Sequence, residues 1–162
     1  MIISITESLL KNRELSFSGE LALPPTVTDR PDSHFEKDAV VTGSYVCTKD
    51  SLRFDGKISL SLSCPCDRCL SPLVIPMEIP FREEFVQNSA DPEVFGFTGD
   101  VVDLTEAVIE TVALALPGKA VCSESCKGLC PSCGADLNAV SCNCSDAPDP
   151  GSKFSELLNL FK

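Results

Sequence analysis

Positive charge and histidine are scarce in this chain of 162 residues. Lysine and arginine total 13 against 24 aspartates and glutamates, which gives a formal net charge of −11. Because proteins bind nucleic acid largely by neutralising phosphates with basic side chains, direct binding of naked RNA is disfavoured. Electrostatically, a basic protein is a more favourable partner than naked RNA. The single histidine, His34, lies in a polar segment, where we expect a solvated side chain.

Catalytic motifs are also lacking. The chain has no glycine-rich phosphate loop and no candidate Ser-His-Asp set. The adjacent carboxylates Glu83 and Glu84 are interpreted as a solvated face, because a catalytic pair needs shaped burial to separate its pKa values. We therefore expect that the protein is not an enzyme and has no small-molecule substrate.

Long apolar runs and a basic leader are missing as well. No segment has 18 unbroken apolar residues, and the N-terminal MIISITESLLKNRE is not typical of a secretory signal. This favours a cytoplasmic protein without membrane contact. Thiols stay reduced in that compartment, so clustered cysteines are expected to bind metal rather than to form disulfides.

Alternating apolar and polar residues dominate the first two-thirds of the chain. They predict antiparallel strands with one buried and one solvated face, over residues 14–23, 52–64 and 73–81, and less regularly over 39–47. Pro76 and Pro80 fall on outward positions and place the last of these strands at a sheet edge. Residues 24–37 and 86–99 are rich in proline, glycine and polar residues and are predicted to be loops.

Helical periodicity replaces the alternation at residue 103. The segment DLTEAVIETVALALPG predicts a helix over about 103–116, with Asp103 as N-cap and Glu106 completing a capping box. A short terminal helix is predicted in SKFSELLNLFK, and its apolar face either packs on the domain or docks onto a partner. Phe154, Leu157, Leu158 and Phe161 form that face.

These elements predict an α+β fold: a mainly antiparallel sheet or partly open barrel with one packed helix, then a cysteine-rich zinc-binding tail and the short helix. Residues 1–118 would form the β-rich domain. Residues 119–162 would form the metal-binding tail, packed on that domain.

Ten cysteines are present, and their spacing indicates metal ligation. A Cys-x-x-Cys turn brings two thiolates to one ion, and a second close pair completes a tetrahedral site. Gly134 suits the positive φ that such a turn needs after its second ligand. The quartet predicted to bind zinc is Cys130, Cys133, Cys142 and Cys144.

A second zinc site is predicted between the hairpin cysteines Cys66 and Cys69 and the tail cysteines Cys122 and Cys126. This requires the helix to pack on the sheet, so that the tail reaches the hairpin. Spacing leaves the partition open, since Cys126 and Cys130 could exchange roles. Cys47 and Cys64 end or continue strands and are expected to be small buried residues.

Besides a binding protein whose fold is stabilised by zinc, two other functions are considered. A thiol oxidoreductase using Cys130 and Cys133 would need a lowered thiol pKa at a helix start within a βαβ unit. Here a glycine follows Cys133, no strand precedes the turn, and another cysteine pair is close. A zinc-containing nucleic-acid-binding module would need the few basic residues to cluster on one face.

The order of motifs resembles the YceD family. After the β-rich half come CDRCL (66–70), GDVVDLTEAVIETVALALP (99–117), CKGLCPSCGADLNAVSCNC (126–144) and SKFSELLNLF (152–161). The family comprises bacterial proteins associated with accumulation of large-subunit ribosomal RNA, with plastid relatives. The resemblance implies a non-enzymatic factor in ribosome biogenesis that docks on a ribosomal or assembly protein, or on a pre-ribosomal RNA–protein particle.

The resemblance also assigns cysteines by position. Cys66 and Cys69 match the family's Cys-x-Arg-Cys turn, and the six cysteines from Cys122 to Cys144 match the tail of some members. Other members lack that tail. This implies that metal stabilises the protein and does not perform the shared function.

Overall fold

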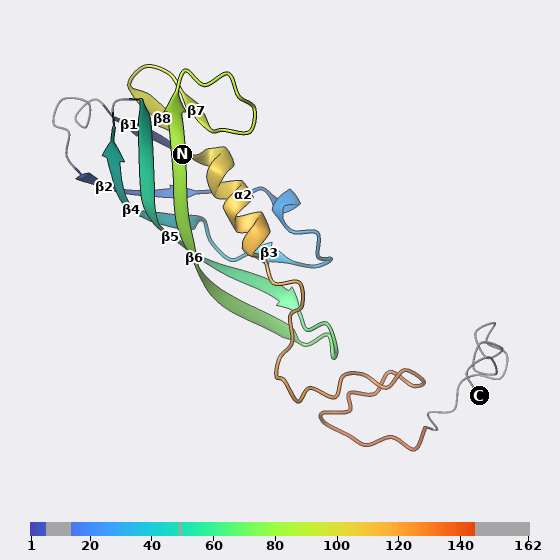
Figure 1. Ribbon diagram of the computed structural model, residues 1–162. Coiled ribbons are helices and arrows are strands. Elements are labelled where there is room, and N and C mark those ends of the chain that lie inside the picture. Colours follow the sequence, from blue (N-terminus) through green and yellow to red (C-terminus); the bar gives the residue numbers. More distant parts are fainter. Residues whose placement is uncertain (6–13, 49, 145–162) are drawn as a thin grey trace.

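The computed structural model describes residues 1–5, 14–48 and 50–144. A large sheet contains, in spatial order, β2 (Glu14–Leu21), β4 (Ala39–Cys47), β5 (Ser51–Pro65), β6 (Pro72–Gln87) and β7 (Gly96–Phe97), with β3 (His34–Phe35) also paired to β5. Its pairings are antiparallel except between β6 and β7. β1 (Ile2–Ser4) and β8 (Val101–Asp103) form a second, antiparallel sheet. Both sheets are open, and the cysteine-rich tail lies beyond the far end of the β5–β6 hairpin (Figure 1).

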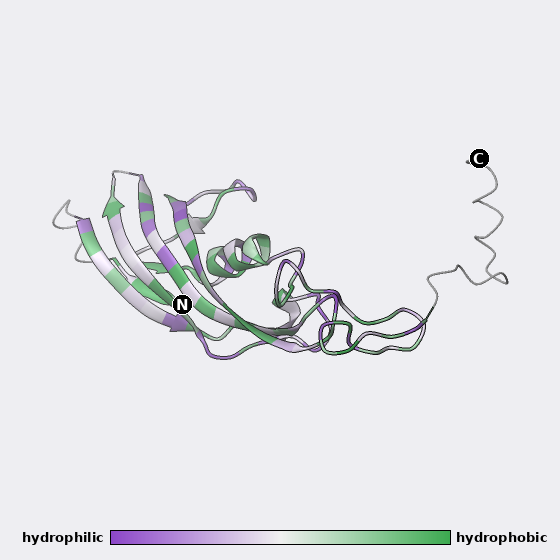
Figure 2. Ribbon diagram, turned by 90° about the horizontal axis from the view of Figure 1, so that it is seen from below, coloured by the Kyte–Doolittle hydropathy of each residue, from purple (hydrophilic) through white to green (hydrophobic). Residues whose placement is uncertain are grey.

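The helix α2 (Thr105–Ala115) lies over the concave face of the curved large sheet (Figure 2). It is preceded in the chain by a short 3₁₀ helix, η1 (Pro25–Val27), in the connection after β2. Ala107, Val108 and Val112 of α2 are buried against the sheet. The α+β class predicted from the sequence is confirmed.

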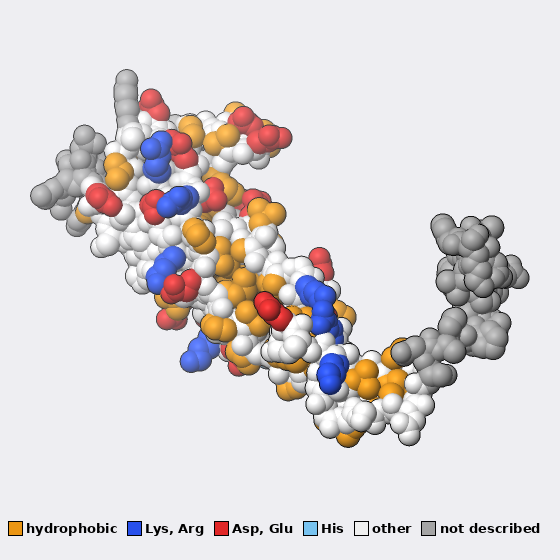
Figure 3. Space-filling model, turned by 60° about the horizontal axis from the view of Figure 1, so that its bottom comes forward, with side chains coloured by type: hydrophobic (Ala, Val, Ile, Leu, Met, Phe, Trp, Pro, Cys, Tyr) orange, Lys and Arg blue, Asp and Glu red, His pale blue; other side chains and the backbone are white. Residues whose placement is uncertain are grey.

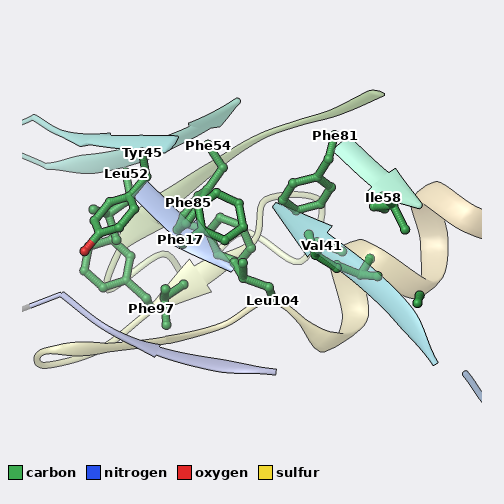
Figure 4. Packing of buried hydrophobic residues seen from close by; sticks show 14 of the residues in the cluster. Phe17, Val41, Tyr45, Leu52, Phe54, Ile58, Phe81, Phe85, Phe97 and Leu104 are labelled. Carbon is green, nitrogen blue, oxygen red and sulfur yellow. The ribbon is translucent and has the colours of Figure 1, made fainter. Parts of the chain in front are cut away.

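The core follows the predicted alternation. Leu52, Phe54 and Ile58 of β5 are fully buried, as the period of two requires for an inward face. Phe54 lies at the centre of an aromatic cluster: its ring packs edge-on against Phe17 and stacks on Tyr45, with centroids 5.4 and 5.2 Å away (Figure 4). Such pairs add to the burial of apolar area that stabilises the sheet.

The open edge of β6 carries prolines, as predicted. β6 pairs with β5 from Pro72 to Val86, whereas β7 pairs only with its last two residues, Val86 and Gln87. Pro76 and Pro80 therefore lie on an exposed edge. Proline has no N–H, so these residues remove donors that another strand would need, and edge-to-edge association is disfavoured.

Two predicted loops contain short elements. Residues 24–37 include η1 and β3, and residues 86–99 include the end of β6 and all of β7. The prediction of loop is wrong for those residues. Strands of two residues are held by backbone pairing and are too short to show a side-chain period.

The start of the helix also differs from the prediction. Leu104, not Asp103, is the N-cap, and no side chain caps it, so the predicted capping box does not form. The Asp103 carboxylate instead accepts hydrogen bonds from the backbone N–H of Thr105 at 2.9 Å and from its hydroxyl at 2.6 Å. A carboxylate therefore still accepts a hydrogen bond from the first helical turn, where the helix dipole favours negative charge.

The predicted terminal helix, residues 152–162, lies outside the described residues. Within the described ranges, no helix is long and apolar enough to cross a membrane.

Candidate metal centres

The tip of the β5–β6 hairpin is a tight turn that presents two thiols. The N–H of Cys66 donates to the carbonyl of Ser71 at 2.8 Å, and the N–H of Leu70 donates to the carbonyl of Cys66 at 2.9 Å. Leu70 takes a left-handed conformation, φ 60°, which costs a non-glycine residue about 1–2 kcal/mol. Cys66 and Cys69 are both buried there.

Asp67, between these cysteines, attaches the tail to the hairpin. Its N–H donates to the carbonyl of Ala120 at 2.8 Å, and its carboxylate accepts from the N–H of Ala120 at 2.6 Å. Arg30 donates to the same carboxylate at 2.7 Å and to the carbonyl of Pro117 at 2.9 Å. The hydrogen bond from Arg30, with that from Ala120, lowers the pKa of Asp67.

Arg68 makes a second attachment further along the tail. Its guanidinium donates to the carbonyl of Cys126 at 2.7 Å, and its own carbonyl accepts from the N–H of Leu129 at 3.0 Å. Gly128 has φ 77°, and a Cβ there would lie 2.9 Å from the Arg68 carbonyl oxygen. Only glycine allows the tail to approach the hairpin this closely.

These attachments bring four sulfurs from hairpin and tail together. Cys66, Cys69, Cys122 and Cys126 have their sulfurs within 4.8 Å of one another. The sulfurs of Cys69 and Cys122 are 3.7 Å apart, and those of Cys66 and Cys126 are 4.0 Å apart. All except Cys122 are buried.

Backbone dipoles around this group favour thiolate. The N–H of Cys122 and the N–H of Arg68 point at the Cys66 sulfur, at 3.4 and 3.5 Å. Hydrogen bonds from the backbone of Cys69, Arg68 and Cys122 outweigh burial and lower the pKa of Cys66 to about 6. Asn138 donates its side-chain amide to the Cys126 sulfur at 3.5 Å.

The second group lies wholly in the tail and contains Cys130, Cys133, Cys142 and Cys144, again with all sulfurs within 4.8 Å. The Cys130–Cys133 turn closes through the N–H of Gly134, which donates to the Cys130 carbonyl at 2.9 Å. Gly134 has φ 73°, the positive value predicted for it. Backbone N–H groups of Cys133 and Ser132 lower the pKa of Cys130 to about 6.

The sulfur positions in both groups are compatible with a tetrahedral metal site. Four sulfurs at about 2.3 Å from a zinc ion would be about 3.8 Å apart, which the 3.7 and 4.0 Å of the group shared by hairpin and tail match, and in the second group all four sulfurs lie within 4.8 Å of one another. A disulfide would bring two sulfurs to about 2.05 Å. Each group could therefore hold a metal ion. The structure also places Cys126 with the hairpin and Cys130 with the tail, a partition that spacing left open.

The remaining candidates lie elsewhere. Cys47 and Cys64 are buried, as expected for core residues. His34 is exposed but stands in β3, with its ring 3.7 Å from the Glu36 carboxylate. Glu84 is exposed as expected, whereas Glu83 is half-buried beneath α2, and this burial raises its pKa. The solvated-face interpretation is therefore wrong for Glu83.

Sequence reasoning missed the residues that connect hairpin to tail. Asp67 and Arg68 lie inside the Cys66–Cys69 turn. Sequence reasoning also missed Asn138 of the GADLN segment, which donates to the Cys126 sulfur within the tail. Charged residues inside a cysteine turn were the available signal, because a tight turn directs its side chains toward whatever packs on it. The partners of Asp67 and Arg68 are backbone groups 50 or more residues away, and they have no signature in the sequence.

Comparison with known proteins places these motifs in a family. A family model described as "Large ribosomal RNA subunit accumulation protein YceD" matches residues 54–161. The uncharacterized protein YlbN of Bacillus subtilis is 33% identical over 106 residues, 62% of each chain. An uncharacterized protein of Mycobacterium tuberculosis H37Rv is 30% identical over 99 residues, 57% of this chain and 44% of its own.

A plant relative has a descriptive name. The maize "Large ribosomal RNA subunit accumulation protein YCED homolog 1, chloroplastic" is 30% identical over 108 residues, 67% of this chain and 31% of its own. The matched part is thus less than two-thirds of each of these relatives. No solved structure matches the chain. The family model covers more than half of the sequence, including both cysteine groups, and the chain belongs to the YceD family.

Proposed function

We propose that this protein is a non-enzymatic cytoplasmic factor that supports accumulation of large-subunit ribosomal RNA and biogenesis of the large ribosomal subunit. It acts by binding a basic ribosomal or assembly protein, free or within a pre-ribosomal particle. The observation that carries the proposal is the family match over residues 54–161, together with the name of the maize relative. The net charge of −11 supports a basic protein as the direct contact.

The proposed cofactor is zinc, one ion in each cysteine group. An all-sulfur set of four ligands suits zinc, which is bound tetrahedrally in closed structural sites. With four protein sulfurs on each ion, no position is left for a reacting water. Zinc at Cys66, Cys69, Cys122 and Cys126 would cross-link hairpin and tail, and zinc at the other four cysteines would fold the tail.

Direct binding to RNA has one observation in its favour. Four basic residues lie at or near the hairpin tip and the tail: Arg30, Arg68, Lys119 and Lys127. Both arginines, however, already donate hydrogen bonds: Arg30 to the Asp67 carboxylate and a backbone carbonyl, and Arg68 to two backbone carbonyls. Lys119 and Lys127 alone form a small footprint for a phosphate backbone, so a protein contact is the better proposal.

The structure gives little support to the alternative that the protein is a thiol oxidoreductase. Cys130 has a lowered pKa, but Cys142 and Cys144 complete its sulfur group, and among residues 128–144 no helix begins at the turn. An insulin-disulfide reduction assay on the reduced protein tests this alternative directly.

Depletion of the protein in its host tests the main proposal. We expect large-subunit RNA to fall relative to small-subunit RNA, and expression of the intact chain to restore the ratio. Affinity capture should recover ribosomal or assembly proteins, and filter binding of naked RNA should be weak at physiological salt. An unchanged RNA ratio together with capture of no such protein would overturn the proposal.

A further inference from the structure

A groove of about 820 Å³ lies between the N-terminal half of α2 and the loop that joins β6 to β7. Its floor is apolar and contains Phe85, Phe95 and Ile109. Phe95 stacks on the buried Phe85, with ring centroids 5.3 Å apart, and is itself only partly covered. The floor therefore offers accessible aromatic and aliphatic surface to a side chain from outside.

The rim of this groove is acidic and uncompensated. Glu93 from the loop and Glu106 and Glu110 from α2 line it, and all three are exposed. As far as the described residues extend, no lysine or arginine lines the groove. A fourth carboxylate, Asp103, is different because it pairs with the amino group of Met1 at 3.2 Å.

Three acidic residues on the outward face of strands β5 and β6 differ from those of the groove, because each is paired with a cation. Lys57 lies 2.6 Å from Glu78, Arg82 lies 3.2 Å from Asp55, and Arg53 lies 3.7 Å from Glu84. Figure 3 shows blue and red side chains interspersed over the sheet, and red beside orange on the projecting loop at upper right. In the groove, by contrast, three carboxylates lie next to apolar side chains, without a cation among the described residues of the lining.

We infer that this groove binds a basic protein segment that carries an apolar side chain. The apolar side chain packs on Phe95 and Ile109, and flanking lysines or arginines face the rim carboxylates. Desolvation of the anchor supplies affinity, while the rim charges steer the encounter and select the partner. The inference rests on the proposed function, which calls for a basic partner, and names the surface that this partner contacts.

Other occupants fit the same chemistry less well. An RNA phosphate backbone would meet three carboxylates without a compensating cation. A second copy of the chain brings a net charge of −11 to the same acidic rim. Residues 145–162 contain three acidic and two basic side chains and so offer no net positive charge.

Site-directed photo-crosslinking in cells tests the identity of the occupant. A photoreactive residue replaces Val94, which lines the groove and is 36% exposed, or Val46, a matched control on β4 that is 40% exposed. We expect Val94 to cross-link to segments of ribosomal or assembly proteins that contain several lysines or arginines, and Val46 not to do so. Cross-links from Val94 to RNA, to a second copy or to residues 145–162, or no cross-link at all, would overturn the inference.

Charge reversal tests the role of the rim. Glu93→Lys with Glu110→Lys is compared with Glu20→Lys and Asp38→Lys, two exposed acidic residues outside the groove. Both double variants change the net charge equally. With the cross-linked segment as a labelled synthetic peptide, we expect about tenfold weaker binding for the groove variant and a change of about twofold or less for the control. Equal weakening in both variants would show that overall charge, not the groove, determines binding.

Failure of this inference can be told apart from failure of the proposed function. If depletion lowers large-subunit RNA and the Glu93→Lys, Glu110→Lys chain restores it fully, the groove is not the contact surface although the function stands. If depletion leaves the RNA ratio unchanged, the proposed function fails, whatever binds in the groove.

Discussion

Replacing Cys69 with serine is expected to remove one zinc ion and to release the tail from the hairpin. The Cys69 sulfur belongs to the group shared by hairpin and tail, and it lies 3.7 Å from the sulfur of Cys122. Serine offers a hydroxyl in place of a thiolate, so the tetrahedral sulfur set is incomplete. The large sheet should stay folded, because most of its core packs among residues of the sheet and α2. Only a small cluster at the far end of β5, Leu62 and Cys64, packs against Ala120 of the tail.

The expected size of the effect follows from the tail's contacts. Ordering residues 120–144 costs about 1 kcal/mol per residue, or about 25 kcal/mol. The hydrogen bonds between hairpin and tail contribute about 1 kcal/mol each, together about 5 kcal/mol. These hydrogen bonds are far smaller than that cost, whereas a structural zinc site contributes about 10–16 kcal/mol, which is of the size needed to hold the tail. With one site lost, the tail should no longer be held on the hairpin.

Elemental analysis and hydrogen–deuterium exchange on the full chain, kept reduced, measure both consequences. We expect two zinc ions per chain in the wild type, one in Cys69→Ser, and fast exchange in residues 120–144 of the variant. Cys64→Ser is the control, because Cys64 is 3% exposed, belongs to no sulfur group and packs with Leu62 and Ala120. It should keep both ions and lose about 1–3 kcal/mol of core stability. The reasoning is refuted if Cys69→Ser keeps two ions, or if Cys64→Ser loses as much zinc.

Three further outcomes are expected. Burial raises the pKa of Glu83, so the folded protein loses stability as the pH rises through that pKa and the carboxylate becomes charged. Calorimetry should show that Glu83→Gln raises Tm by a few degrees at pH 7 and leaves it unchanged at pH 4. Gly128→Ala should loosen the tail by proteolysis, whereas Gly118→Ala, with open space at its Cβ, should not; equal sensitivity would contradict the close approach at Gly128. Zinc competes with protons for the thiols of each group; the pKa is lowered for Cys66 and Cys130 and raised for Cys122 and Cys144 by their neighbouring sulfurs. Because metal binding requires thiolate, a zinc-sensitive dye should report increasing release as the pH is lowered, and release that does not depend on pH would contradict ligation by these thiols.

Strand prediction succeeded where side chains alone determine the pattern. Leu52, Phe54 and Ile58 alternate with polar residues because one face of β5 is buried, and a period of two can be recognised from the sequence alone. The prolines of β6 were equally informative, since a missing N–H is tolerated only at an edge. The short strands β1, β3, β7 and β8 could not be predicted, because their backbone pairing leaves no periodic trace.

The cysteine pattern by itself indicated that the tail could hold metal, because two thiols separated by two residues in a turn can reach a common ion. It did not determine which thiols share an ion. Cys66 and Cys122 are distant in the sequence and meet only because Asp67, Arg68 and Gly128 hold the tail against the hairpin. The acidic groove likewise depends on tertiary structure, which alone places Glu93 beside Glu110 while pairing Glu78 and Glu84 with cations. Composition states how much charge a chain carries, but only the packing of strands, helix and loop decides which charges remain unpaired and what surface lies next to them.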